Sequence, residues 1–263
     1  MTNTTIITAL FDIGREKNGD GRTIDEYLKW FDKTLSLNVP MVIFIQEKFK
    51  DFVLSRRNLD QTKIIIQPLN KIPYYNFKEN IEKIIFSDEY LYKIKDPSRI
   101  ECNLSLYNII QYSKFDWLEI AADNNYFDTD NYFWMDAGCS RFFDGVDTKN
   151  AWPTNSKLIC DNKITIQGNV NTKKYYNNWP GNDEYIWDNN CILVGTLFGG
   201  NKTICKKMNS LVKNLFEEYL KKDCVNNEQI ILGILLKQYP ELFNVYIELN
   251  GKHLPLFKAL CSY

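Results

Sequence analysis

The fold is decided by the segment Tyr132-Phe133-Trp134-Met135-Asp136-Ala137-Gly138-Cys139-Ser140-Arg141. Four large apolar residues run into one carboxylate, and a polar stretch precedes them. A short apolar run bounded in this way is typical of a strand buried on both faces. Asp136 would then lie at the carboxyl end of the strand, which is the edge where open α/β sheets bind ligands. The same residues also fit a core strand that ends in a turn, with Asp136 as the turn residue.

The segments before this strand alternate between strand and helix patterns. β-Branched and apolar residues predict strands at 5–11, 41–45 and 63–67. Thr23 and Glu26 have the spacing of a capping box, and apolar residues recur at helical spacing from there to Leu35. The order strand, helix, strand, helix, strand predicts a mostly parallel sheet with right-handed crossovers.

The second half of the chain continues the α/β pattern. We expect a helix over 103–122, strands at 163–167 and 191–195, an amphipathic helix over 204–219, a helix opening at 226–229 and a last strand at 245–249. Residues 144–190 are otherwise irregular and rich in Asn, Asp, Pro and Trp, so we expect a lid or substrate-facing region there. With no repeat or linker, the sequence predicts one mixed α/β domain over residues 1–263.

Composition excludes several classes of protein. The 263 residues carry 32 basic and 33 acidic side chains and a net charge of −1, so no bulk field favours nucleic acid. No apolar run reaches the length of a membrane span, and residues 1–10 lack the features of a signal peptide. The seven cysteines form no C-x-x-C pair, which indicates a reducing compartment. We therefore expect a cytoplasmic protein.

Four segments together resemble the HtrL/YibB family. They are residues 8–15 (Thr-Ala-Leu-Phe-Asp-Ile-Gly-Arg), 133–141, 195–200 (Gly-Thr-Leu-Phe-Gly-Gly) and 226–229 (Asn-Asn-Glu-Gln). The resemblance covers most of the chain, in matching order. That family is similar to GT-A glycosyltransferases, so the resemblance implies a single nucleotide-sugar-binding α/β domain, usually assisted by Mn²⁺ or Mg²⁺. It implies a sugar transferred from a nucleotide diphosphate, with a UDP-sugar favoured, to a carbohydrate or other acceptor.

The chemistry of sugar transfer places demands on the site. Negative charge develops on the departing diphosphate and must be neutralised by a cation. GT-A enzymes use an Asp-x-Asp triplet for ribose and metal, and the corresponding triplet here is Asp136-Ala137-Gly138. The second carboxylate is replaced by glycine, which puts the usual metal geometry in question. Asp144 offers a replacement, and the single histidine, His253, would tilt a metal site towards Mn²⁺. Each of these two residues also fits an ordinary turn residue at the surface.

The resemblance implies a set of site residues, each named by its role. The reacting sugar would lie near Glu228 and Gln229, and the metal would bind Asp136 and His253. Acceptor or sugar contacts would come from Phe198, Gly199, Gly200 and Trp187, the last being one of several aromatic residues suited to stacking on sugar rings. The nucleotide and its phosphates would contact Thr8, Ala9, Leu10, Arg15, Lys114, Asp136, Ala137, Gly138 and Lys252.

Each assignment has a structural alternative. Arg15 can close a turn, and Lys114 can be a solvated helix residue. Glu228 can interact favourably with the dipole of the helix that it begins. Phe198-Gly199-Gly200 can form a tight turn between a strand and a helix. Arg141 can pair with Asp136 or with a diphosphate. At the level of function, the alternative is a nucleotide- or glycan-binding protein without transfer activity. A metal-independent hydrolase is disfavoured because the sequence shows no Ser-His-Asp or Cys-His set.

Overall fold

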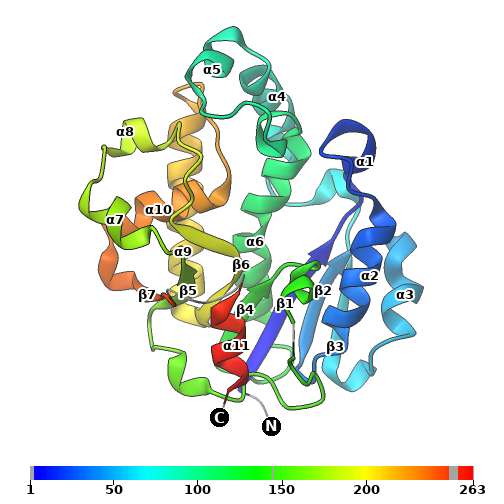
Figure 1. Ribbon diagram of the computed structural model, residues 1–263. Coiled ribbons are helices and arrows are strands. Elements are labelled where there is room, and N and C mark those ends of the chain that lie inside the picture. Colours follow the sequence, from blue (N-terminus) through cyan, green and yellow to red (C-terminus); the bar gives the residue numbers. More distant parts are fainter. Residues whose placement is uncertain (1–2, 144, 249–253, 263) are drawn as a thin grey trace.

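The computed structural model describes residues 3–143, 145–248 and 254–262. In these residues the chain forms a seven-stranded sheet with the order β3-β2-β1-β4-β6-β5-β7 (Figure 1). The strands are β1 (Thr4–Leu10), β2 (Met41–Ile45), β3 (Thr62–Ile66), β4 (Asn131–Met135), β5 (Ile164–Gly168), β6 (Leu193–Asn201) and β7 (Phe243–Tyr246). Only β6 runs antiparallel to its neighbours, β4 and β5, within the described sheet. The predicted α/β class with a mostly parallel sheet is confirmed.

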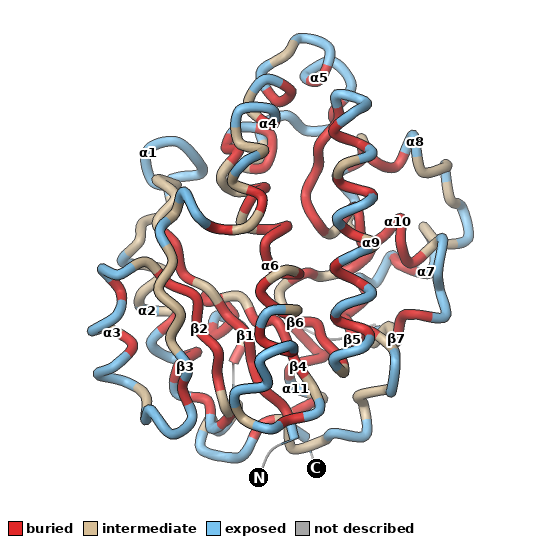
Figure 2. Tube along the Cα trace, turned by 180° about the vertical axis from the view of Figure 1, so that it is seen from behind, coloured by how far each residue is buried: buried red, intermediate tan, exposed pale blue. Residues whose placement is uncertain are grey.

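Helices cover both faces of the sheet because successive strand residues point in opposite directions. Ile7 and Trp134 face one cluster, whereas Ile6 and Phe133 face the other. The first face is covered by α4 (Lys78–Ile85), α6 (Ser105–Asn124), α9 (Lys202–Leu220) and α10 (Glu228–Gln238). The second is covered by α2 (Ile24–Leu35), α3 (Lys50–Leu54) and α11 (Pro255–Cys261). Figure 2 shows the strands buried between these two layers.

The long helix α6 is fixed against the carboxyl ends of β1 and β4 by stacked rings. Trp117, which is fully buried, stacks on Phe11 at 5.4 Å and on Trp134 at 5.9 Å between ring centroids. Large aromatic rings buried in this way contribute strongly to packing. The stack lies less than one helical turn from Lys114, so it also fixes where that side chain enters the sheet edge.

Most predicted elements are found within two residues of their expected positions. The capping box is present, with the Thr23 side chain accepting from Glu26 N and the Glu26 side chain accepting from Thr23 N. The irregular region contains β5 and two short helices, α7 (Thr172–Asn177) and α8 (Asn182–Tyr185). Two further short α-helices are α1 (Arg15–Asn18) and α5 (Asp88–Lys93).

Phe198-Gly199-Gly200 form neither the turn considered as an alternative nor a junction before the helix, because they lie inside β6 and pair with β4. A Cβ atom at Gly199 would overlap the Tyr132 carbonyl oxygen, so glycine there allows close approach of the two strands. The following helix begins instead at Lys202, with Asn201 as its cap. The last strand also lies earlier than expected, at Phe243–Tyr246 rather than 245–249.

Candidate active site

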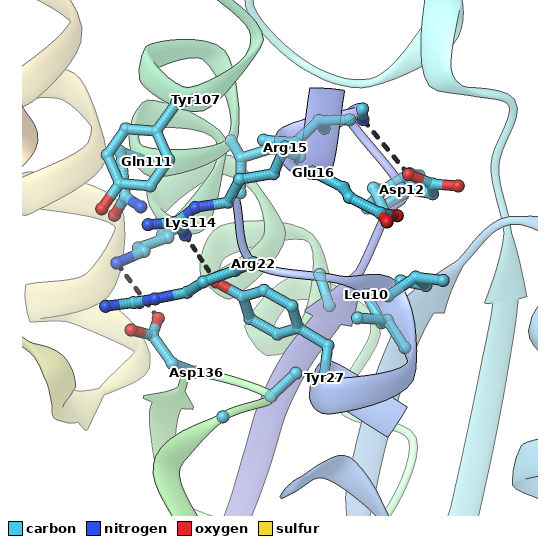
Figure 3. A pocket seen from close by; sticks show the side chains of 18 of the residues that line it. Leu10, Asp12, Arg15, Glu16, Arg22, Tyr27, Tyr107, Gln111, Lys114 and Asp136 are labelled. Carbon is cyan, nitrogen blue, oxygen red and sulfur yellow. Dashed lines mark hydrogen bonds and ion pairs between the residues drawn. The ribbon is translucent and has the colours of Figure 1, made fainter. Parts of the chain in front are cut away.

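A cavity of about 340 Å³ lies at the carboxyl edge of the sheet, between β1 and β4. From β1 the chain crosses to β2 on one side, whereas β4 lies on the other side, so this is the point where strand order reverses. Such switch points form ligand-binding crevices in open α/β sheets. Figure 3 shows side chains from the β1–α2 segment, from α6 and from the end of β4 facing one another there.

The turn after β1 has a fixed shape. Gly14 has a φ of +70°, a backbone conformation that L side chains rarely adopt. Asp12 closes the turn by accepting from Gly14 N, and Gln46 accepts from Asp12 N. A hydrogen bond from Lys48 holds the pKa of Asp12 below its ordinary value, against the effect of burial. The turn therefore projects Arg15 into the cavity from a defined position.

Arg15 is held between two walls of the cavity. Its guanidinium contacts Asp20 through two atom pairs at 2.6 and 2.8 Å and donates to the Tyr27 hydroxyl. It also lies 4.9 Å from the centre of the Tyr107 ring. Burial opposes its charge, but the contacts with Asp20 outweigh burial and raise the pKa of Arg15. The side chain is therefore a fixed cation in the cavity wall (Figure 3).

Asp136, Lys114 and Glu228 form a chain of charges that runs from the cavity into the core. The Lys114 ammonium lies 3.1 Å from Asp136 Oδ1 and 2.7 Å from Glu228 Oε1, and it donates to the Gly195 carbonyl at 3.1 Å. An ammonium has three donors, so these contacts use all of them. The Lys114 and Glu228 side chains are 2% and 1% exposed, whereas Asp136 is 31% exposed. Only the Asp136 end of the chain therefore opens to solvent.

The charge states in this chain follow from burial and pairing. Burial disfavours charge on Lys114, but Asp136 and Glu228 outweigh burial and raise its pKa. For Glu228, burial is the largest effect and raises its pKa, although Lys114 opposes that shift. Glu228 Oε2 is buried and has no hydrogen-bond partner in the described residues. One lysine thus holds two carboxylates, of which the inner one is poorly solvated.

Asp136 has one oxygen committed and one available. Its Oδ1 accepts from Trp134 Nε1 at 2.7 Å and contacts Lys114, whereas Oδ2 has no partner in the described part of the chain. The same residue is also joined to β6, because Asp136 N donates a hydrogen bond to the Thr196 carbonyl. The carboxylate is therefore oriented by its own strand and by α6, and Oδ2 remains an acceptor for a hydroxyl group.

The structure brings together seven of the residues expected at the nucleotide. Ala9, Leu10, Arg15, Lys114, Asp136, Ala137 and Gly138 all line the cavity. Thr8 lies just before them in β1, and its side chain is fully buried. Glu228 lies behind Lys114, outside the cavity lining, and Gln229 accepts a hydrogen bond from Gly195 N.

Other expected residues lie elsewhere. Phe198, Gly199 and Gly200 are buried in β6 and do not line the cavity. Trp187 packs near Tyr90, with ring centroids 5.9 Å apart, so it too is outside the lining. Lys252 and His253, like Asp144, lie outside the described residues.

Several lining residues were missed by the sequence reasoning, namely Lys17, Arg22, Tyr27, Tyr107, Gln111 and Trp134. A signal for two of them was present: Tyr107, Gln111 and Lys114 have the spacing i, i+4, i+7, which places them on one face of a helix. Choosing Lys114 as a site residue therefore implied Tyr107 and Gln111. For Arg22 and Tyr27 no comparable local signal exists, because the fold of the β1–α2 segment brings them to the cavity.

The residues described here do not fit a divalent metal site. No group of three or more His, Cys, Asp or Glu side chains suited to a metal is found among them. Asp136 is the carboxylate in the expected position, and the Lys114 ammonium already occupies its Oδ1. A second cation beside that ammonium would meet repulsion. Among the described residues that line the cavity, basic side chains outnumber carboxylates.

These features define an α/β protein with a basic cavity at the switch point of a mostly parallel sheet. The chain belongs to the family described as "Bacterial protein of unknown function (HtrL_YibB)", which matches residues 2–262. The Protein HtrL of Escherichia coli (strain K12) is 24% identical over 283 residues, covering 99% of this chain and 93% of that protein. The predicted family membership is confirmed.

A solved structure is also similar in outline. The apo form of mouse xyloside xylosyltransferase 1 matches with 9% identity and a TM-score of 0.41, over 92% of this chain and 84% of that chain.

Among the described residues, none of the helices combines the length and the apolar character that crossing a membrane requires.

Proposed function

We propose that this protein is a glycosyltransferase that binds a nucleotide-diphosphate sugar, with a UDP-sugar as the first donor to test, in the cavity between β1 and β4. The observation that carries the proposal is the joining of one oriented carboxylate, Asp136, with several cations and aromatic rings at the switch point of the sheet. Carboxylate oxygens accept from sugar hydroxyls, cations suit phosphates and rings suit a base.

In this proposal Asp136 Oδ2 accepts from the ribose and Arg15 contacts the nucleotide. Lys114 acts by holding Asp136, because its three donors are already used. Glu228 and Gln229 act indirectly, from behind the cavity lining. Glu228 accepts a hydrogen bond from Lys114, and Gln229 accepts one from Gly195 N. Lys252 and His253 remain proposed contacts of the diphosphate. The cofactor expected from the resemblance, Mn²⁺ or Mg²⁺, is tested by titration. Thr8, Phe198, Gly199, Gly200 and Trp187 would support the site without touching the nucleotide.

The reaction breaks the bond between the sugar's anomeric carbon and the diphosphate oxygen. The leaving diphosphate keeps the electron pair, an acceptor hydroxyl oxygen bonds to the anomeric carbon, and the hydroxyl proton is lost to a base or to solvent. The chain's cations stabilise the leaving group because they face the position where charge develops.

A second function, nucleotide or glycan binding without transfer, is favoured by one observation. The carboxylate expected to serve as the acceptor base, Glu228, is 1% exposed and is bound to Lys114. A general base must come within hydrogen-bond reach of the proton that it removes. A protein that binds the donor and lacks this base would bind without turnover.

Asp136→Asn tests the proposal and separates the two functions. UDP release from a panel of UDP-sugars, with and without carbohydrate acceptors and Mn²⁺, measures turnover, and the rise in Tm with UDP measures binding. We expect turnover in the wild type and, in the variant, a loss of roughly tenfold or more, because a hydrogen bond to a charged group is worth about 1.5–3 kcal/mol.

Asp130→Asn is the matched control, because Asp130 lies just before the other end of β4 and contacts Asn3. UDP binding without turnover of any donor would favour the binding protein. No binding of UDP or other nucleotide diphosphates would refute the transferase and the nucleotide-binding protein alike.

A further inference from the structure

Arg141 differs from the other arginines that line the cavity. Arg15 is paired with Asp20, and Arg22 lies 3.4 Å from the same carboxylate. Arg141 has no carboxylate within ion-pair distance among the described residues. Its charge is therefore available to a ligand in the cavity that it lines.

The Arg141 side chain is nevertheless held in place. Its Nε donates to the Gly138 carbonyl at 3.0 Å, and its guanidinium lies 4.6 Å from the centre of a Trp30 ring. A cation on an aromatic face is stabilised, and one fixed hydrogen bond leaves the two Nη groups as a pair of donors. A guanidinium presented in this way matches the geometry of two phosphate oxygens.

Gly138 lies against both the arginine and the Trp30 ring. A Cβ atom at this position would lie 3.3 Å from Trp30 Cε3 and 3.5 Å from Arg141 Nε. The first distance is slightly tighter than ordinary van der Waals contact and the second is ordinary, so a Cβ atom would require a small shift of the ring and would lie in contact with the guanidinium. Gly138 is also the position where the Asp-x-Asp pattern has its second carboxylate. In this chain that position is the platform for a cation.

The balance of charge in the lining agrees with an anionic ligand. Five cationic side chains, Arg15, Lys17, Arg22, Lys114 and Arg141, line the cavity against three carboxylates, Asp12, Glu16 and Asp136. Asp12 is paired with Lys48 and Asp136 with Lys114, so neither neutralises Arg141.

We propose that Arg141, seated on Gly138 and Trp30, binds the diphosphate directly and takes the place of a divalent metal in neutralising it. The inference rests on the proposed function for its nucleotide, but its diphosphate subsite can be tested separately. Binding of the diphosphate then requires no metal and depends on a guanidinium at position 141.

The test is calorimetric titration of inorganic pyrophosphate and of UDP into the full chain, in EDTA and separately with Mn²⁺. We expect both probes to bind in EDTA, and we expect Arg141→Gln to weaken both roughly tenfold to hundredfold, the range for a hydrogen bond to a charged group. Arg141→Lys should fall between, since an ammonium cannot contact two oxygens with a planar fork. Affinity should also fall as salt rises.

Arg56→Gln is the matched control, because Arg56 also lies on an aromatic ring, that of Phe52, and pairs with Asp32 outside the cavity. It should leave both affinities unchanged, and the Tm of each variant reports its folding. Binding that appears only with Mn²⁺, or that Arg141→Gln leaves intact, overturns the inference. Pyrophosphate bound through Arg141 by a protein that turns over no nucleotide sugar would support the subsite and refute the transferase.

Discussion

Replacing Lys114 by Met tests the chain of charges that supports the site. Methionine keeps an unbranched apolar stem of similar length and removes the ammonium between Asp136 and Glu228. Removing one partner of a buried ion pair leaves the other charge uncompensated, which costs about 3–5 kcal/mol. For a chain of this size we expect Tm to fall by about 6–20 °C, at about 2–4 °C per kcal/mol.

The loss in Lys114→Met should depend on pH, with a sign fixed by Glu228. Burial already raises the pKa of Glu228 in the wild type, and Lys114 opposes that shift. Without Lys114, the folded state holds the Glu228 proton more tightly than the unfolded state, whose Glu pKa is about 4.3. Stability therefore falls as pH rises above that value, by at most about 1.4 kcal/mol per pH unit. The deficit relative to the wild type should be larger at pH 7.5 than at pH 5.

Urea unfolding at the two pH values measures this effect, with Lys114→Met/Glu228→Gln as the second variant. The double variant has no buried charge at either position, so it should recover much of the stability and lose the pH dependence. Lys206→Met, which removes an exposed lysine paired with Asp123, should leave the unfolding midpoint close to that of the wild type. A deficit that is equal at both pH values, or one that the double variant fails to reduce, would refute this account of the charge chain.

Two further substitutions probe the strand β6 beside this chain. Gly195→Ala should destabilise by about 1–3 kcal/mol, because its Cβ would overlap Glu228 Oε1, and an equal effect in a Glu228→Ala background would contradict that cause. Phe198→Ala should cost about 3–5 kcal/mol through loss of a fully buried ring that packs on Phe115, while pyrophosphate affinity in the folded protein stays unchanged. A specific loss of affinity in Phe198→Ala would place that residue at the ligand after all.

The fold could be predicted because local pattern and tertiary structure agree in the first half of the chain. Residues 41–45 form a strand as expected, since every residue of that apolar run is buried. The Thr23 and Glu26 spacing identified the start of α2 through contacts only three residues apart. The error at Phe198-Gly199-Gly200 has a different cause. Two glycines usually indicate a turn, but here they allow β6 to lie close against β4, which no local pattern reveals.

In the candidate site, too, the features visible in the local sequence were predicted and those set by tertiary packing were not. Asp136 was found because a carboxylate at the end of a buried strand is visible in the sequence, and the helix face of Tyr107, Gln111 and Lys114 was within reach of the same reasoning. The partners of these residues were not. Lys114 and Glu228 are separated by 114 positions, and only the packing of α6 against α10 brings them to 2.7 Å. The sequence thus predicted which residues lie at the cavity more readily than what each of them contacts.

The sequence and the structure lead to different interpretations of the glycine that replaces the second Asp of the Asp-x-Asp pattern. In the sequence, glycine at position 138 is a missing carboxylate and favours a protein that has lost its activity. In the structure, the same glycine leaves room for Arg141 on Trp30, and Lys114 already occupies the inner oxygen of Asp136. Restoring the acid by Gly138→Asp would therefore set a carboxylate against the guanidinium and close the space that glycine leaves open. The glycine and the arginine are neighbours in the cavity wall, joined by the hydrogen bond from Arg141 Nε to the Gly138 carbonyl.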